Sequence, residues 1–209
     1  MSAPDLAEAA QQLAREGLVV GTAGNVSVRT RAGLVITPSA VPYDQLTSAH
    51  LAALDAVGVQ VGGTHRKSSE WRLHLALYQA RGDVQAVVHT HSAAATALAV
   101  LRRPIPPIHY AMHQLGGEVP VAPYATFGTA ELAEGVVAAL GAGHAALMAN
   151  HGAVVVGESL AAALERARLL EWVCRVYLHA LSGGTPHVLS PSEMAAAAER
   201  LQSYRPAPP

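Results

Sequence analysis

Apolar residues recur along the chain at two spacings, one typical of helices and one typical of strands. Recurrence every three or four residues predicts amphipathic helices, at residues 5–16, 71–78, 92–101, 129–140, 160–181 and 192–204. Alternation and short continuous apolar runs predict strands, at residues 25–29, 34–37, 84–89, 145–149 and 153–156. Only Thr30–Gly33 separates the first two strands, so we expect a hairpin there. Ser92 stands where it would cap the third helix.

The interleaving of helices and strands predicts the fold class. No glycine-rich dinucleotide-binding fingerprint follows a predicted strand. We therefore predict an α/β fold, a three-layer α/β/α domain whose central sheet is mixed and mainly antiparallel. The 209 residues contain no internal linker, charge block or repeat, so we expect a single domain over 1–209, with a short proline-rich tail at 205–209.

Composition argues against several classes of function. The formal net charge is -1, which provides no broad positive field for nucleic acid or an acidic membrane. No apolar run approaches the roughly 20 residues of a transmembrane helix, and the first residues lack the apolar core of a signal peptide. We expect a cytoplasmic protein that binds neither nucleic acid nor membrane. The one cysteine, Cys174, lies among apolar helical positions and is expected to be buried.

Histidines occur where predicted strands end. His89 and His91 close one apolar run, and alternate residues of a strand point to the same side, so both imidazoles can reach one ion. His151 lies at the reversal between two more apolar runs and is the best candidate for a third ligand. Three imidazoles with one open position are typical of a catalytic zinc. Such a site also accepts cobalt, nickel or manganese.

Three polar turns suggest an anion site. Gly21–Asn25 is a loop that contains two glycines, and its backbone N–H groups can line an anion-binding concavity. Thr37–Ala40 follows a strand, and Ser68–Glu70 precedes a helix, where free N–H groups and the helix dipole favour anions. Each turn alone is more simply an ordinary turn or cap. Together with the histidines they favour a phosphate-bearing ligand.

Two further side chains bear on the mechanism. Glu70 either complements the helix dipole or acts as a general base, because a metal that polarises a carbonyl acidifies the adjacent C–H. Lys67 is the only lysine and thus the only candidate for a Schiff base. Its place between Arg66 and the serines suits attraction of phosphate or simple solvation. A single lysine therefore favours the metal mechanism.

An ordered set of motifs resembles the class II aldolase/adducin family. The similarity runs from about Leu13 to Tyr204, and the set as a whole is highly specific. Its members are Gly21–Arg29, Ile36–Pro38, Ser68–Arg72, Val88–His91, Ala122–Thr129 and His151–Gly152. Ile108–Tyr110, together with Ala122–Thr129, is most similar to the branch of the family that acts on L-fuculose 1-phosphate.

The resemblance implies a metal-dependent, reversible cleavage of a ketose 1-phosphate to dihydroxyacetone phosphate and a small aldehyde. In the nearest branch these are L-fuculose 1-phosphate and L-lactaldehyde. It implies one Zn²⁺ per subunit, held by His89, His91 and His151, with Glu70 binding the metal in the resting site and becoming the base once substrate displaces it.

The resemblance also assigns residues around the substrate. Tyr110, reaching in from a neighbouring subunit of a cyclic homotetramer, would exchange a proton with the C4 oxygen, and Tyr204 would close over the aldehyde end. The phosphate and substrate positions implied are Thr22, Asn25, Ser39, Ala40, Ser68, Ser69 and Phe127. The family usually has glycine where this chain has Ala40. Because alanine disfavours positive φ, we expect weaker phosphate binding.

Rival functions remain open on the same scaffold. The nearest is an aldolase for 5-deoxyribulose 1-phosphate or a related sugar 1-phosphate. Next come a pentulose-phosphate 4-epimerase, which re-adds the aldehyde to its other face, and a methylthioribulose-phosphate dehydratase. An adducin-like interaction module would lack the metal, and the presence of all three histidines and Glu70 argues against it.

Overall fold

A computed structural model describes residues 3–202 of the chain. The helices are α1 (Ala3–Arg15), α2 (Trp71–Ala80), α3 (Ala93–Val100), α4 (Ala130–Leu140), α5 (Leu160–Gly183) and α6 (Pro191–Gln202). The strands are β1 (Asn25–Arg29), β2 (Gly33–Ile36), β3 (Ala52–Asp55), β4 (Gln60–Gly62), β5 (Ala86–Thr90), β6 (Val121–Ala122), β7 (Ala145–Met148) and β8 (Gly152–Gly157). Short 3-10 helices are η1 (Tyr43–Gln45), η2 (Ser48–His50) and η3 (Tyr110–Leu115).

The eight strands form one sheet in the order β4-β3-β2-β1-β5-β8-β7-β6. Only the pair β6 and β7 is parallel. The predicted hairpin is present, with Ser27 opposite Ile36 in an antiparallel pair. The expectation of a mixed, mainly antiparallel sheet is confirmed.

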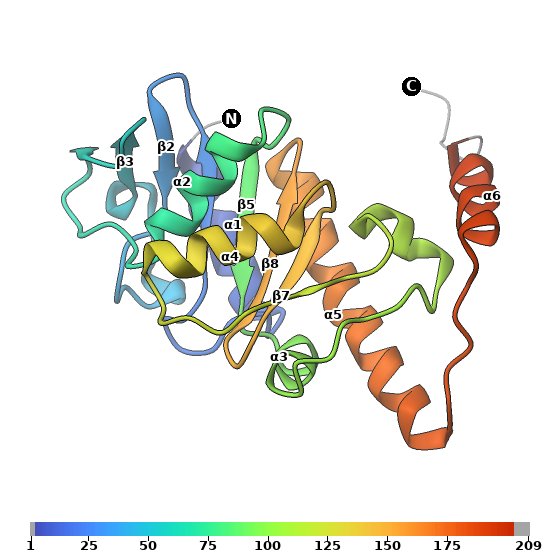
Figure 1. The fold of residues 1–209 in the computed structure, drawn as a ribbon. Helices are drawn as coiled ribbons and strands as arrows, with labels where there is room; N and C mark the ends of the chain where they lie inside the picture. The colour runs from blue at the N-terminus through green and yellow to red at the C-terminus, as the bar shows by residue number, and fades with distance from the viewer. Residues whose placement is uncertain (1–2, 203–209) are drawn as a thin grey trace, which may run out of the picture.

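Helices cover both faces of the sheet (Figure 1). Helices α2 and α4 lie on one face, whereas α1, α3 and α5 lie on the other. Strand alternation divides the apolar side chains between the two layers. Val87 packs in the core under α2 and α4, while its neighbour Val88 packs under α1, α3 and α5. The predicted three-layer α/β/α fold is thus confirmed, and Cys174 is buried in the second of these cores as expected.

Three strands and one cap differ from the sequence-based expectation. Strands β3, β4 and β6 were not predicted, because each has four residues or fewer and too little alternation to mark it. Ser92 occupies the N-cap of α3 as predicted, but its side chain makes no cap hydrogen bond. The N–H groups of Ala94 and Ala95 donate instead to the buried Glu171 carboxylate of α5, at 3.1 and 3.0 Å. A charged acceptor from a packed helix stabilises the helix N-terminus more strongly than a hydroxyl.

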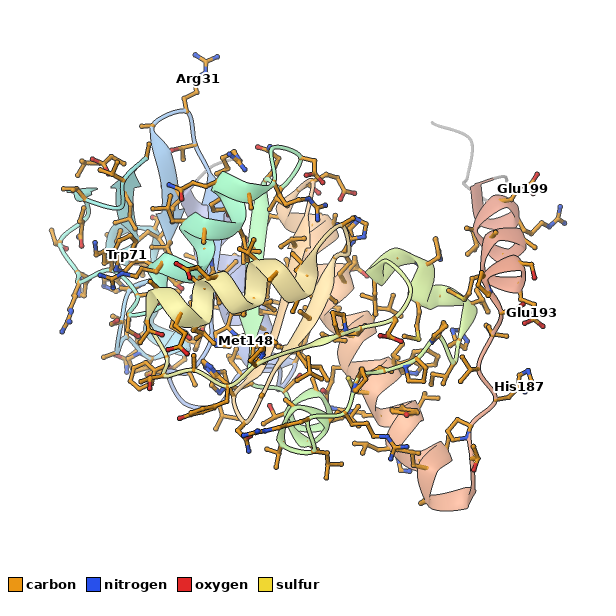
Figure 2. The ribbon with its side chains drawn as sticks, viewed as in Figure 1. Arg31, Trp71, Met148, His187, Glu193 and Glu199 are labelled. Atoms are coloured by element: carbon orange, nitrogen blue, oxygen red, sulfur yellow. The ribbon has the colours of Figure 1, made fainter. Side chains whose placement is uncertain are left out.

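The C-terminal part leaves the three layers. Helix α6 lies against η3, apart from the sheet, and Figure 2 shows Glu193 and Glu199 on it together with His187 on the preceding segment. Across residues 3–202, no helix combines the length and apolar character that a membrane span requires. The predicted tail at 205–209 lies outside the described residues.

Candidate active site

The end of β5 and the turn between β7 and β8 bring the three histidines together. His89 and His91 stand at the end of β5, which pairs with β8 so that His89 lies opposite Val154. His151 lies in the tight turn between β7 and β8, where Asn150 adopts a positive φ of 54°. Gly152 is required beside it, because a Cβ there would lie 2.3 Å from the carbonyl oxygen of Thr90. The close approach of β8 to β5 places His151 next to the strand end.

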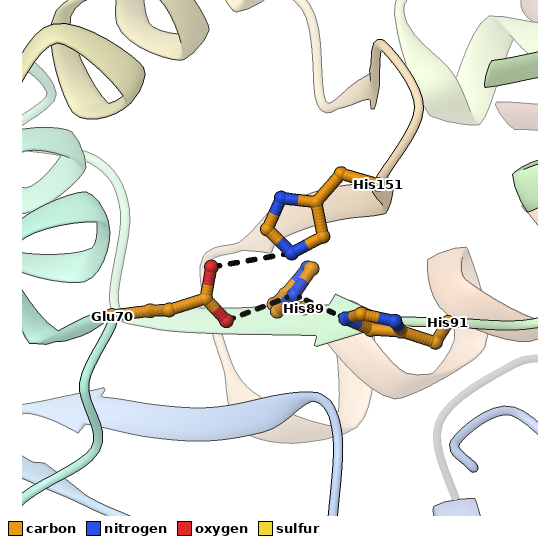
Figure 3. Close-up of side chains that lie close together, drawn as sticks. All are labelled: Glu70, His89, His91 and His151. Atoms are coloured by element: carbon orange, nitrogen blue, oxygen red, sulfur yellow. Dashed lines mark hydrogen bonds and ion pairs between the residues drawn. The ribbon is translucent and has the colours of Figure 1, made fainter. Parts of the chain in front are cut away.

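Glu70 completes the cluster from another layer. It occupies the N-cap of α2, and its side chain makes no cap hydrogen bond with that helix. Figure 3 shows its carboxylate pointing at the histidines. Oε2 lies 3.1 Å from Nε2 of His89, and Oε1 lies 3.4 Å from Nε2 of His151. Nε2 of His91 lies 3.0 Å from that of His89.

These four side chains fit a tetrahedral divalent metal. Their ligand atoms all lie within 4.8 Å of one another, and the closest pairs approach the roughly 3.3 Å that separates the ligands of a tetrahedral zinc. Nδ1 of His89 donates to the carbonyl oxygen of Ala153 at 2.9 Å, which leaves Nε2 free to bind an ion. Oε1 of Glu70 is buried without a hydrogen-bond partner among the described residues, as expected of a ligand atom.

The electrostatics favour a charged carboxylate beside two neutral imidazoles, those of His91 and His151. Burial alone would raise the pKa of Glu70, but His89, His151 and Asn25 together hold it well below the usual range. Burial and the neighbouring His89 and His151 lower the pKa of His91 to about 4, and burial also lowers that of His151. Neutral imidazoles and ionised carboxylates are the forms that bind metal. His89 differs, because its contacts with Glu70 and the Ala153 carbonyl outweigh burial and raise its pKa. Glu70, His91 and His151 are thus in their metal-binding forms at neutral pH, whereas a metal ion at His89 competes with a proton.

A cavity of about 490 Å³ opens above this cluster. The three polar turns line it together, and so do all of the predicted phosphate and substrate residues: Thr22, Asn25, Ser39, Ala40, Ser68, Ser69 and Phe127. Tyr124 and Asn150 also line the cavity, and the sequence analysis missed both. Tyr124 belongs to the Ala122–Thr129 motif, so its place beside Phe127 was a usable signal.

Serine side chains hold two of the turns against each other. Oγ of Ser39 donates to the carbonyl oxygen of Lys67 at 3.0 Å and accepts from the N–H of Ser69 at 3.0 Å. Oγ of Ser68 accepts from the N–H of Glu70 at 3.2 Å. The two Ser39 hydrogen bonds tie the Thr37–Ala40 turn to the Lys67–Ser69 segment beside the cavity.

Ala40 takes the backbone conformation that glycine would take. Its φ is 61°, in the left-handed region that favours glycine. The loop therefore keeps the conformation that places its backbone at the cavity, at a cost in strain. The expectation of weaker phosphate binding stays a prediction.

Two predicted catalytic residues lie elsewhere or beyond the description. Tyr110 is in η3, is 49% exposed, and stacks on the His109 ring with centroids 4.4 Å apart. It does not line the cavity within one chain. Tyr204 lies outside the described residues. Lys67 also points away from the cavity, because its Nζ donates to the carbonyl oxygen of Gly58 and lies 3.9 Å from the centroid of the Trp71 ring.

His74 is a buried histidine that was not among the candidate site residues of the sequence analysis. It is fully buried on α2, one turn after Glu70, and its Nε2 lies 2.5 Å from Oδ1 of Asn25. The signal was available, because residues four apart share a helix face. Burial and the nearby His89 lower the pKa of His74 to about 3, so the ring is neutral.

Comparison with known proteins identifies the family of this chain. Residues 4–178 match the family described as Class II Aldolase and Adducin N-terminal domain. An L-fuculose phosphate aldolase of Escherichia coli is 45% identical over 92% of this chain and 90% of its own length. A 5-methylthioribulose-1-phosphate/5-deoxyribulose-1-phosphate aldolase of Rhodospirillum rubrum is 40% identical over 95% of this chain and 90% of its own.

A solved structure agrees as well. An L-fuculose 1-phosphate aldolase superposes with a TM-score of 0.92 at 36% identity, covering 96% of this chain and 95% of that one. Sequence and structure thus match over nearly the full length of each protein. The chain belongs to the class II aldolase and adducin family.

Proposed function

We propose that this protein is a metal-dependent aldolase that reversibly cleaves L-fuculose 1-phosphate to dihydroxyacetone phosphate and L-lactaldehyde. One observation carries the proposal: the Glu70 carboxylate and three histidines cluster beside a cavity that is lined by Glu70, His91 and His151 together with backbone and hydroxyl donors. The E. coli relative named for this activity supports the choice of sugar.

Glu70 is the proton-transfer group. Its carboxylate is charged and buried, and it borders the cavity, so it can take or return a proton at a carbon held there. A divalent metal such as zinc, bound by the histidines, would supply the positive charge that makes a C–H beside a carbonyl acidic. His89, His91 and His151 would hold that ion, with Glu70 as a further ligand when no substrate is present.

The polar turns are the proposed phosphate site. Thr22, Ser68 and Ser69 offer hydroxyl or backbone donors at the cavity, and the N-terminus of α2 adds its dipole. Ser39 contributes by holding the turns together, since its hydroxyl is already bonded to both sides. Phe127 is 64% exposed at the cavity and suits the aldehyde end of the sugar.

A second substrate is supported by a specific observation. Aldolases named for 5-deoxyribulose 1-phosphate are 40% and 34% identical to this chain, in R. rubrum and Bacillus thuringiensis. That sugar would give the same dihydroxyacetone phosphate and differ only in the aldehyde. The choice between the two substrates depends on the part of the cavity near Tyr124 and Phe127.

A coupled assay for dihydroxyacetone phosphate tests both substrates. L-Fuculose 1-phosphate, 5-deoxyribulose 1-phosphate and ribulose 5-phosphate are supplied separately, with and without chelator. Chelator-sensitive release is expected, with the highest kcat/KM for L-fuculose 1-phosphate. The Glu70→Gln variant is expected to lose on the order of 100-fold or more in kcat. Bound metal with no release from any sugar would instead favour the epimerase or the dehydratase.

We also propose a cyclic homotetramer in which Tyr110 serves a neighbour's site. The exposure of Tyr110, on a surface that also carries His109 and the 45%-exposed Trp172, supports this placement. Subunits carrying Glu70→Gln are mixed with subunits carrying Tyr110→Phe, after denaturation and refolding together. Each variant alone is expected to be nearly inactive, while the mixture regains activity because some sites combine both wild-type residues. A mixture no more active than its parts, or a monomeric protein, would contradict the shared site.

A further inference from the structure

A continuous line of buried polar side chains runs from the interior of the α2 layer to the proposed base. Hydrogen bonds join Tyr78 to Ser27 at 2.7 Å, Ser27 to Nδ1 of His74 at 2.7 Å, and Nε2 of His74 to Asn25 at 2.5 Å. The last link runs from Nδ2 of Asn25 to Oε2 of Glu70 at 3.0 Å. All five side chains are buried. They come from β1 and from α2 with its N-cap, so the line also joins these two elements.

The chemistry of the groups sets the direction of every proton in this line. A carboxylate only accepts, so the amide nitrogen of Asn25 faces Glu70 and donates to it. Oδ1 of Asn25 then faces His74 and accepts, which requires the proton of that imidazole to be on Nε2.

The remaining two links follow from the first two. With its proton on Nε2, the neutral His74 ring must accept at Nδ1, so the hydroxyl of Ser27 donates to it. The Ser27 oxygen in turn accepts from the hydroxyl of Tyr78. Each donor therefore points toward Glu70.

The opposite arrangement would disturb the base. With the His74 proton on Nδ1, Nε2 would accept, and the amide of Asn25 would turn to donate to it. Oδ1 of Asn25 would then face Oε2 of Glu70, and two acceptors at that distance repel. The tautomer of His74 is therefore coupled to the orientation of the amide that holds the carboxylate.

We propose that His74 is a positioning residue, which sets the side-chain amide of Asn25 and thereby holds the carboxylate of Glu70 in the metal site. The line fixes one carboxylate oxygen by hydrogen bonding and leaves the other, Oε1, without a hydrogen-bond partner among the described residues. The hydrogen bond to Oε2 thus fixes the position of the carboxylate, and Oε1 remains available to a metal or a substrate proton. The inference rests on the proposed function, which supplies the role of Glu70, but its test does not depend on that role alone.

Two substitutions at position 74 separate positioning from mere packing. His74→Gln keeps an amide N–H that can donate to Asn25, whereas His74→Phe fills the space without a donor. His74→Phe is expected to lower kcat about 10- to 100-fold and zinc affinity by a similar factor. His74→Gln is expected to recover most of both losses. Leu77→Ala, a buried position on the same helix, is the stability control, with a lowered Tm but unchanged kcat and zinc affinity.

Zinc affinity is measured by competition with a chromophoric chelator, so this readout stands even if the wild-type protein cleaves none of the sugars. In that case the proposed function fails while the His74 inference is still decided. Equal zinc affinity and kcat in His74→Phe and wild type, or a Gln variant no better than the Phe variant, would overturn the inference.

A measurement on the wild-type protein also tests the inference, and it does not depend on whether a variant folds. Nitrogen NMR of the histidine rings is expected to show His74 neutral, with its proton on Nε2. A proton on Nδ1, or a doubly protonated ring at neutral pH, would refute the directed line of hydrogen bonds and the positioning role with it.

Discussion

Nε2 of His151 lies 3.4 Å from Oε1 of Glu70, although one residue comes from the β7–β8 turn and the other from the start of α2. The contact joins the turn at the end of β7 and β8 to the helical layer that covers one face of the sheet. It makes the proposed metal site dependent on both layers at once.

Loss of His151 is expected to empty this site. His151→Asn removes one of four candidate ligands and should lower zinc affinity on the order of 100-fold, because each ligand contributes a few kcal/mol of binding. Metal content after dialysis, measured by mass spectrometry, checks this. His187→Asn, an exposed position drawn well away from the sheet in Figure 2, should keep its metal. Equal metal content in the two variants would contradict the assignment of His151.

A protein without any lysine is expected to remain active. Lys67→Arg removes the only lysine of the chain, and Lys67 Nζ is already engaged with Gly58 and the Trp71 ring outside the cavity. Because no Schiff base can then form on a lysine, retained activity would exclude that mechanism. Borohydride with substrate should also leave the wild-type enzyme active. Inactivation by borohydride, together with a dead Lys67→Arg variant, would point to covalent catalysis instead.

Replacing Ala40 by glycine is expected to stabilise the protein. At a φ of 61°, an alanine carries about 1–2 kcal/mol of strain, which exceeds the roughly 0.5–1 kcal/mol of extra unfolded-state entropy that glycine brings. Denaturant titration should therefore show Ala40→Gly more stable by about 0.5–1 kcal/mol. Ala142→Gly, at an exposed turn position without positive φ, should be slightly destabilised. A lower KM for the sugar phosphate in Ala40→Gly would support the predicted cost of alanine at the phosphate turn.

An ion pair at the end of α1 should make stability depend on pH. Arg168 binds Glu16 through two hydrogen bonds of 2.8 and 2.9 Å, and this contact lowers the pKa of Glu16. A carboxylate with a lowered folded pKa contributes stability above its unfolded pKa, and the contribution is lost as pH falls through the folded value.

Glu16→Gln should accordingly reduce the free energy of unfolding by up to about 1 kcal/mol at pH 7. The difference from wild type should shrink as pH falls below the unfolded pKa of about 4.3 and vanish once pH is below the lowered folded pKa. Urea titrations at several pH values measure it. Glu8→Gln, an exposed change on the same helix, is the control and should show no such trend. A constant difference at all pH values would mean that packing, not charge, carries the effect.

The sequence by itself determined the class of this fold and the identity of its chemistry. Local spacing is sufficient for helices such as Leu160–Gly183 and for the histidines that close β5, because helical and strand periods are properties of a few consecutive residues. The short strands β3, β4 and β6 were not predicted, because pairing with neighbouring strands, and not a periodic pattern of their own, makes them strands.

Only the tertiary structure decided which polar groups act together. The sequence left Glu70 open between a helix acid and a base, and only the fold placed its carboxylate against His89 and His151. His74 was not among the candidate residues from the sequence, and only the structure places its ring against Asn25. Contacts between distant segments depend on how layers pack, and no local period records them. The motifs therefore indicated the candidate ligands, while the packing of α2 over the sheet determined which polar side chains contact them.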